Sequence, residues 1–247
     1  MISNVRNIQD AFVNLYKSKQ FVTDKTGVKT IELVGASFVC DKPAIFGEPN
    51  WDYIKRELEW YESESLNVND LQPTPQIWQD ISDKDGMIHS NYGYLIYSEK
   101  NGRQFIKVRD ELIKNPNSRR AVMIYTRPSI HNEYNKNGMS DFICTNAVQY
   151  LIRDKRLHAV VQMRSNDVVF GYRNDFAWQR YVLEFLADEL KLEYGDITWQ
   201  VGSLHVYERH FNFIEDEIED RKRKKETLKL ADMAMGNYYE KVSKFYE

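Results

Sequence analysis

Cysteine and long apolar segments are both scarce in this sequence, and their scarcity excludes several classes of protein. Cysteine occurs only at positions 40 and 144, too few for a framework of disulfides or for a zinc site built from thiolates. No segment approaches the roughly 18 apolar residues of a membrane-spanning helix, and the opening MISNVRNIQDAF lacks the apolar core of a signal peptide. The five histidines lack the spacing of metal ligands. We therefore expect a cytoplasmic protein that binds neither a membrane nor a metal ion.

A strong excess of one charge is also absent. The chain carries 34 lysine and arginine residues against 37 aspartate and glutamate residues, a formal net charge of −3, so it has no overall positive field for polymeric DNA or RNA. Its 247 residues, 42% of them hydrophobic, suffice to bury one core of full size. We expect one domain over residues 1–247, with a charged helical segment from about residue 213, where acidic residues precede basic residues by four positions.

Apolar residues recur at two different periods, which predicts an α+β fold. Helical spacing occurs in three segments, residues 4–18, 53–61 and 175–190. Segments rich in β-branched and apolar residues predict strands over residues 28–40, 120–128, 142–152, 157–165 and 196–207. The turn RDKR joins the third and fourth of these strands as a hairpin. Proline, aspartate and asparagine predict a loop over residues 70–86.

Polar residues gather between apolar segments in the second half of the chain, where burial is costly unless they bind one another or a polar ligand. Cys144 lies in GMSDFICTNAVQY, the segment QMRSNDVVFGYRNDFAW is dense in polar side chains, and NPNSRR ends in Arg119 and Arg120. Arginines bind phosphate oxygens through paired hydrogen bonds and lower the pKa of a nearby thiol. Taken alone, Cys144 could be a small core residue and the arginines a surface pair. Together with SLHVYERH (203–210), these segments form a specific pattern.

Several motifs, in this order, resemble those of the thymidylate synthase family. They are DKTGVKT (24–30), RELEWY (56–61), NPNSRR (115–120), the Cys144 segment, MRSNDVVFG (163–171), RNDFAW (173–178) and GSLHVYERH (202–210). The resemblance implies a thymidylate synthase-like fold, a mixed and mainly antiparallel sheet flanked by helices, with one sheet face forming a dimer interface. DKTGVKT, MIYTRPS and NKNGMSDF further resemble a bacteriophage branch of the family that acts on the cytosine nucleotide dCMP.

The resemblance implies a reaction in which Cys144 is the nucleophile. As a thiolate, Cys144 would add to C6 of the pyrimidine, and C5 would then attack the one-carbon unit of 5,10-methylenetetrahydrofolate, the co-substrate. Glu57, the glutamate of RELEWY that matches the family's motif, would position water and move protons between the base and the reduced folate.

Phosphate binding is implied for a set of basic and hydroxyl side chains, namely Lys25, Arg119, Arg120, Arg164 and Ser165. Family members carry arginine at the position of Lys25, so this chain departs from the pattern there. Because the paired arginines come from the second subunit in that family, the resemblance also implies a homodimer.

Roles for the remaining site residues follow in the same way. Asn166 would lie with the residues that bind dCMP, and His205 and Tyr207 would bind the sugar 3′-hydroxyl, although the last two could also form an ordinary pair on a strand. Asp167 would accept hydrogen bonds from the pterin ring of the folate, and Trp78 would stack near that ring.

Asp175 occupies the position where members that use uracil carry asparagine. A carboxylate can accept hydrogen bonds from the 4-amino group of cytosine and from a protonated N3, whereas an amide suits uracil. The resemblance therefore implies dCMP as the substrate. An aspartate that caps the helix predicted at 176–190 is the alternative explanation.

The product depends on whether water or a hydride captures the one-carbon unit. Methylating members end in an apolar tail with a terminal valine and carry histidine after the nucleophile, whereas this chain ends in KVSKFYE and carries Thr145. Both departures favour water and a hydroxymethyl product. A thymidylate synthase, a hydroxymethylase of dUMP or CMP, and a non-catalytic protein that binds nucleotides or RNA remain the alternatives.

Overall fold

Six β-strands form one mixed sheet in the computed structural model, which describes the backbone of residues 3–243 and the side chains of residues 3–228. The strand order is β1-β2-β6-β5-β4-β3, in which β5 and β6 run parallel and the other neighbours run antiparallel. The strands are β1 (Val22–Thr23), β2 (Lys29–Val39), β3 (Val122–Ile124), β4 (Thr145–Arg153), β5 (Arg156–Asp167) and β6 (Glu193–Tyr207). This sheet confirms the predicted α+β fold.

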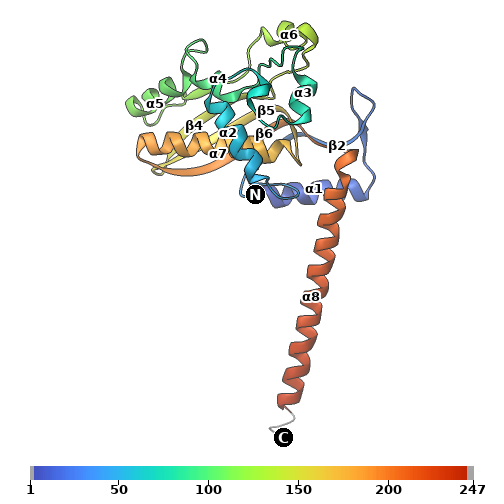
Figure 1. Cartoon of the computed structure of the whole chain (residues 1–247). Coiled ribbons are helices and arrows are strands. Elements are labelled where there is room, and N and C mark those ends of the chain that lie inside the picture. The colour runs from blue at the N-terminus through green and yellow to red at the C-terminus, as the bar shows by residue number, and fades with distance from the viewer. Residues whose placement is uncertain (1–2, 244–247) are drawn as a thin grey trace.

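Helices pack against the sheet, and Figure 1 shows the last of them, α8, extending away from the rest of the molecule. The helices are α1 (Val5–Lys17), α2 (Trp51–Glu62), α3 (Gln76–Ile81), α4 (Tyr92–Tyr97), α5 (Gln104–Lys114), α6 (Ile130–Glu133), α7 (Gly171–Leu190) and α8 (Phe211–Ser243). The helices predicted at 4–18, 53–61 and 175–190 are thus α1, α2 and α7. Ion pairs one helical turn apart, such as Arg221 Nε to Glu217 Oε1 at 2.6 Å, occur in α8 as its charge pattern predicts.

Two predicted elements differ from the structure. The segment 70–86 is not a continuous loop, because α3 begins directly after Pro75, a residue that is well tolerated at a helix start. The strand predicted over residues 120–128 is confined to Val122–Ile124, since the amides of both Tyr125 and Thr126 converge on the carbonyl of Asn146 instead of continuing the ladder. The helices α4 and α5 between these segments were not predicted.

The unit β5–α7–β6 positions most of the polar segments found in the sequence. The parallel register pairs Ser165 with Ser203 and Asp167 with His205, so that the ends of two long strands lie side by side. The Asp167 carboxylate accepts hydrogen bonds from the amides of Val169 (3.0 Å) and Phe170 (2.7 Å), which fold the turn that leads from β5 into α7. This turn brings the end of β5 and the beginning of α7 to one place.

Helices cover one face of the sheet and leave part of the other open. Along β5, Ala159, Val161 and Met163 are buried, whereas Gln162 between them is exposed. Val34 on β2 is 82% exposed. Among the described residues, no helix combines the length and the apolar character needed to cross a membrane.

Candidate active site

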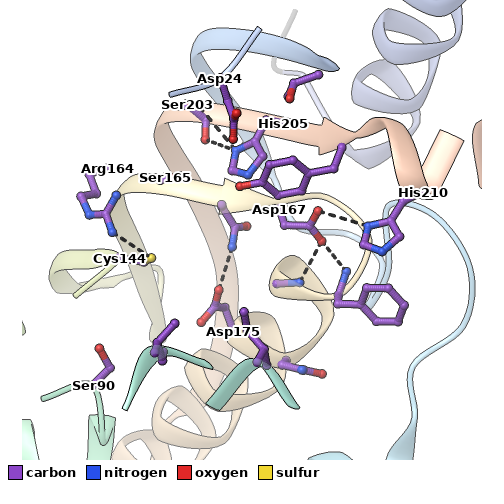
Figure 2. A pocket seen from close by; sticks show the side chains of 18 of the residues that line it. Asp24, Ser90, Cys144, Arg164, Ser165, Asp167, Asp175, Ser203, His205 and His210 are labelled. Atoms are coloured by element: carbon purple, nitrogen blue, oxygen red, sulfur yellow. Dashed lines mark hydrogen bonds and ion pairs between the residues drawn. The ribbon is translucent and has the colours of Figure 1, made fainter. Parts of the chain in front are cut away.

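A cavity of about 900 Å³ opens where β5, β6 and the start of α7 meet α2, α3 and the turn between β1 and β2. Every side chain predicted to act on the nucleotide or the folate lines it, except Arg119 and Arg120. The lining residues from the prediction are Lys25, Glu57, Trp78, Cys144, Arg164, Ser165, Asn166, Asp167, Asp175, His205 and Tyr207. Figure 2 shows several of them converging from β5, β6 and α7.

Cys144 lies directly before β4 and is half-buried. Its Sγ is 3.5 Å from Nη2 of Arg164, whose Nε donates to the carbonyl of Ile143 at 3.1 Å and holds the guanidinium in place. Burial raises the pKa of the Cys144 thiol to about 11, while the charge of Arg164 opposes this effect. Arg164 lowers the pKa of the thiol, as predicted, but in the single chain the effect of burial on this pKa is larger. A nucleophilic thiolate therefore needs further positive charge or a proton acceptor.

Glu57 is buried on α2, 4% exposed, and its carboxylate faces the cavity. Its Oε1 accepts a hydrogen bond from the Tyr53 hydroxyl, and the indole Nε1 of Trp78 lies 3.3 Å from the same oxygen and 3.0 Å from that hydroxyl. Burial raises the pKa of Glu57 to about 7, although the hydrogen bonds from Tyr53 and Trp78 lower it. A carboxyl group with this pKa can both accept and donate a proton near neutral pH.

Asp175 lies in the second turn of α7 and shares the cavity with Cys144. Asn166 donates from Nδ2 to Oδ2 of Asp175 at 2.7 Å, and its own Oδ1 accepts from the indole of Trp199 at 3.2 Å. Burial raises the pKa of Asp175 to about 8, and the negative charge of Glu57 raises it further. The helix-capping alternative for Asp175 is wrong, because α7 begins at Gly171 with Phe170 at the N-cap position, and Asp175 lies inside the helix.

The Oδ1 atom of Asp167 accepts hydrogen bonds from the amides of the turn before α7, whereas its Oδ2 atom has no hydrogen-bond partner among the described residues. Oδ2 is buried and lies 3.9 Å from Nδ1 of His210. Burial would raise the pKa of Asp167, but His210 and the amides of Phe170 and Gly171 lower it overall. The group is thus a fixed carboxylate with a free acceptor at the cavity wall.

His205 and Tyr207 project from β6, with their rings edge to face at 4.9 Å between centroids. Nδ1 of His205 lies 3.3 Å from the carbonyl oxygen of Ser203, an atom that can only accept, so this hydrogen bond requires a proton on Nδ1. Lys25 follows Asp24, whose carboxylate accepts hydrogen bonds from Thr26 and Val28 and shapes the turn at the rim of the cavity.

Arg119 and Arg120 lie outside the cavity of their own chain. The side chain of Arg120 is 80% exposed and its Nη2 pairs with Glu111 Oε1 at 3.3 Å, and the carbonyl of Arg119 accepts a hydrogen bond from Gln149. Within one chain the structure therefore does not bring the arginine pair to the other predicted phosphate ligands.

Several lining residues were not identified from the sequence. Tyr53 precedes Glu57 by one helical turn, a spacing that places the two on one face and could have indicated the pair. Asp141 is buried, and its carboxylate accepts hydrogen bonds from the Ser90 amide at 2.8 Å and the Ser90 hydroxyl at 2.5 Å, which ties two loops together. Their separation along the chain gave no signal of this contact.

Thr145 and the C-terminal KVSKFYE are the two sequence features that favour a hydroxymethyl product, and the structure describes the first of them fully. Thr145 is fully buried, does not line the cavity, and donates from its hydroxyl to Tyr92 at 3.0 Å, so it can affect the cavity only through Tyr92. The end of KVSKFYE, residues 244–247, lies outside the described residues. No group of three or more potential metal ligands occurs within the part of the chain that the structure describes.

Comparisons with known proteins agree on the family. A family model described as thymidylate synthase matches residues 8–245. Deoxycytidylate 5-hydroxymethyltransferase of Enterobacteria phage T4 is 56% identical over 226 residues, which cover 87% of this chain and 92% of the relative. Thymidylate synthase of Fusobacterium nucleatum is 30% identical over 187 residues, covering 74% of this chain and 64% of the relative. The solved structure of thymidylate synthase from T4 phage matches with a TM-score of 0.67 at 25% identity, covering 83% of this chain and 77% of that chain.

Proposed function

Because the chain belongs to the thymidylate synthase family, we propose that it transfers a one-carbon unit from 5,10-methylenetetrahydrofolate to C5 of dCMP, where water captures it as a hydroxymethyl group. The observation that carries this proposal is the carboxyl group of Asp175, held by Asn166 in the same cavity as the Cys144 thiol. This pair combines a nucleophile for the ring with a group that distinguishes cytosine from uracil. Because relatives that are 56% identical come from bacteriophages, we place the reaction in the cytoplasm of a bacterial host.

The selection of cytosine follows from a chain of hydrogen bonds with fixed directions. The Trp199 indole can only donate, so Oδ1 of Asn166 must face it, and the amide Nδ2 must face Asp175. Oδ2 of Asp175 is therefore an acceptor already in use, and Oδ1 remains for the base. Because Oδ1 has two lone pairs, it can accept from both the 4-amino group and protonated N3 of cytosine, whereas it repels O4 of uracil.

The proposed chemistry begins at Cys144. Its thiolate bonds to C6 of the base, the electron pair of the C5–C6 double bond moves to C5, and C5 bonds to the one-carbon unit. The reduced folate supplies this unit. After the C5 proton leaves to a base and the folate departs, an exocyclic methylene group remains at C5. Water bonds to this carbon and gives a proton to Glu57, the double bond's electron pair moves into the ring, and the C6–S bond breaks to regenerate the thiolate.

The folate-facing side of the cavity has the residues that a pterin needs. Trp78, Ile77 and Ile81 of α3 form an apolar wall, which suits a flat ring. The Oδ2 atom of Asp167 accepts no hydrogen bond from the described residues and has His210 Nδ1 at 3.9 Å, so it can accept from the N–H donors of a pterin. We assign Trp78 and Asp167 to the folate on these grounds.

The phosphate site is incomplete within one chain. Arg164, Ser165 and Lys25 line the cavity, whereas Arg119 and Arg120 point elsewhere. We propose that the open sheet face forms a homodimer in which the partner supplies its arginine pair. Those charges would add to Arg164 in stabilising the Cys144 thiolate. His205, through Nε2, and Tyr207 would hold the sugar hydroxyl.

Mass spectrometry and release of the C5 hydrogen test the proposal together. The protein is incubated with 5-tritiated dCMP and methylenetetrahydrofolate, and we expect tritium release with addition of CH₂O to the nucleotide. Addition of CH₂ would instead identify a methylating enzyme, and no release of tritium would identify a non-catalytic binding protein. Cys144→Ser should abolish release, while Cys40→Ser, a change at a buried cysteine outside the cavity, should not. Competition with dUMP and CMP tests the base and the sugar.

A further inference from the structure

Tyr53 is a cavity residue to which neither the sequence motifs nor the proposed chemistry gives a role. It lies on α2 one turn before Glu57, and its hydroxyl donates to Oε1 of Glu57. The same hydroxyl accepts a hydrogen bond of 3.0 Å from the Trp78 indole on α3. Because an indole N–H can only donate, the direction of both hydrogen bonds is fixed, and the phenol proton must point to Glu57.

The two oxygens of Glu57 are consequently unequal. Oε1 is in contact with two donors, the Tyr53 hydroxyl and the Trp78 indole at 3.3 Å. Oε2 accepts no hydrogen bond from any residue that the structure describes, and Glu57 lines the cavity. We infer that Tyr53 is a positioning residue that, with Trp78, occupies Oε1 of Glu57 and so reserves Oε2 for the proton of the water that captures the one-carbon unit.

This inference rests on the proposed function, since it concerns the step in which water is the nucleophile. In that step the water oxygen bonds to the exocyclic carbon, its O–H bond breaks, and the proton moves to Oε2. A carboxylate free to rotate would spread its basicity over two oxygens and several directions. With Oε1 held, Oε2 keeps one orientation toward the cavity.

Tyr53 also affects the protonation of Glu57. The titratable groups facing Glu57 are Tyr53 and Tyr61 from its own helix and Asp175 from α7. Burial raises the pKa of Glu57 to about 7, and the hydrogen bond from Tyr53 lowers it, so that without Tyr53 the pKa would be higher still. Burial keeps Tyr53 itself protonated by raising its pKa well above the ordinary value.

The test that does not depend on activity is a titration of Glu57 in Tyr53→Phe. The protein is labelled with ¹³C-carboxyl glutamate, and the Glu57 resonance is assigned by its loss in Glu57→Gln. In Tyr53→Phe we expect the pKa of Glu57 to rise from about 7 to about 8 or higher, because the charged carboxylate loses a hydrogen bond. Tyr16→Phe is the matched control, because Tyr16 also donates to a glutamate, Glu215, but lies outside the cavity. An unchanged Glu57 titration in Tyr53→Phe would overturn the inference.

The second readout is the pH profile of product formation in single turnovers. In Tyr53→Phe the acid limb should move upward, so that the rate falls about 5-fold or more at pH 7 and recovers by about pH 9. An equal loss at every pH would indicate a merely structural role and contradict the inference. If Tyr53→Phe folds poorly, Tyr53 can instead be replaced by a fluorinated tyrosine, whose hydroxyl is a stronger donor. This replacement should move the acid limb of the pH profile to lower pH. Wild-type protein that makes no hydroxymethyl product would refute the proposed function, whereas the carboxyl titration would still decide the role of Tyr53.

Discussion

Replacing Asp175 by asparagine should reverse the preference for the base. In the wild type Asn166 donates to Oδ2 of residue 175 at 2.7 Å, and the Trp199 indole prevents Asn166 from turning over. The new amide must therefore direct its oxygen toward Asn166 and its NH₂ group toward the base. That NH₂ group can donate to O4 of uracil, but it meets the 4-amino group of cytosine donor to donor.

The size of the effect follows from the two contacts that become mismatched. With dCMP, Asp175→Asn loses the acceptor for the 4-amino group and the acceptor charge for N3, and each buried mismatch costs about 1–3 kcal/mol. Together they cost about 2–6 kcal/mol, and each 1.4 kcal/mol is a factor of ten, so the ratio of kcat/KM for dCMP over dUMP should fall by about 30-fold to 10⁴-fold.

Competition between the two nucleotides in one reaction measures that ratio directly. Tritium release from 5-labelled dCMP and dUMP gives kcat/KM for each, and Asp188→Asn, an exposed position on the same helix, is the control for the chemical change. A dCMP preference that survives Asp175→Asn, with Asp188→Asn unaffected, would refute this account of base selection.

Two further predictions concern stability and assembly. The pKa of Asp175 in the folded chain is raised to about 8 from its ordinary value of 3.8, so the free energy of unfolding should decline as the pH rises between these values. Asp175→Asn should remove this decline, so that between pH 5 and pH 8 it gains about 4 kcal/mol relative to wild type in denaturant titrations. If the difference in unfolding free energy between Asp175→Asn and wild type did not change with pH, the pKa of Asp175 would not be raised and its carboxyl group would be hydrated. If the partner supplies Arg119 and Arg120, mixing inactive Cys144→Ser subunits with inactive subunits lacking both arginines should restore about a quarter of wild-type activity, because half the dimers are mixed and each has one complete site. No recovery after subunit exchange would place the arginines in their own chain's site.

Most of the fold could be predicted because its long elements have clear periods. The apolar spacing of α1 and α7 and the hairpin around Asp154 and Lys155, which adopt the positive φ angles of a tight turn, are local properties. Short elements such as α3 and α4 owe their existence to packing, and six residues carry too little pattern to reveal it. That residues 1–247 form one domain stays a prediction.

The site residues came from motifs, whereas their electrostatics required three dimensions. Sequence motifs placed Cys144 and Arg164 together, but they could not show that burial would exceed the effect of the guanidinium on the thiol. The pairing of Tyr53 with Glu57 was accessible in principle from helical spacing. The contact of Asp141 with Ser90 was not, because the residues lie 51 positions apart and belong to two irregular loops.

The end of β5, the hydrogen-bonded turn at Asp167 and the start of α7 form one continuous segment that carries Arg164 near one end and Asp175 at the other. On the roles proposed above, this segment binds the phosphate of the nucleotide through Arg164 and the base through Asp175, so the spacing of the two residues selects the length of the nucleotide. A monophosphate fits this spacing. Each additional phosphoryl group would displace either the base from Asp175 or the phosphate from Arg164. The chain would thus sort nucleotides by size as well as by base, and the di- and triphosphates around it would compete poorly for the cavity.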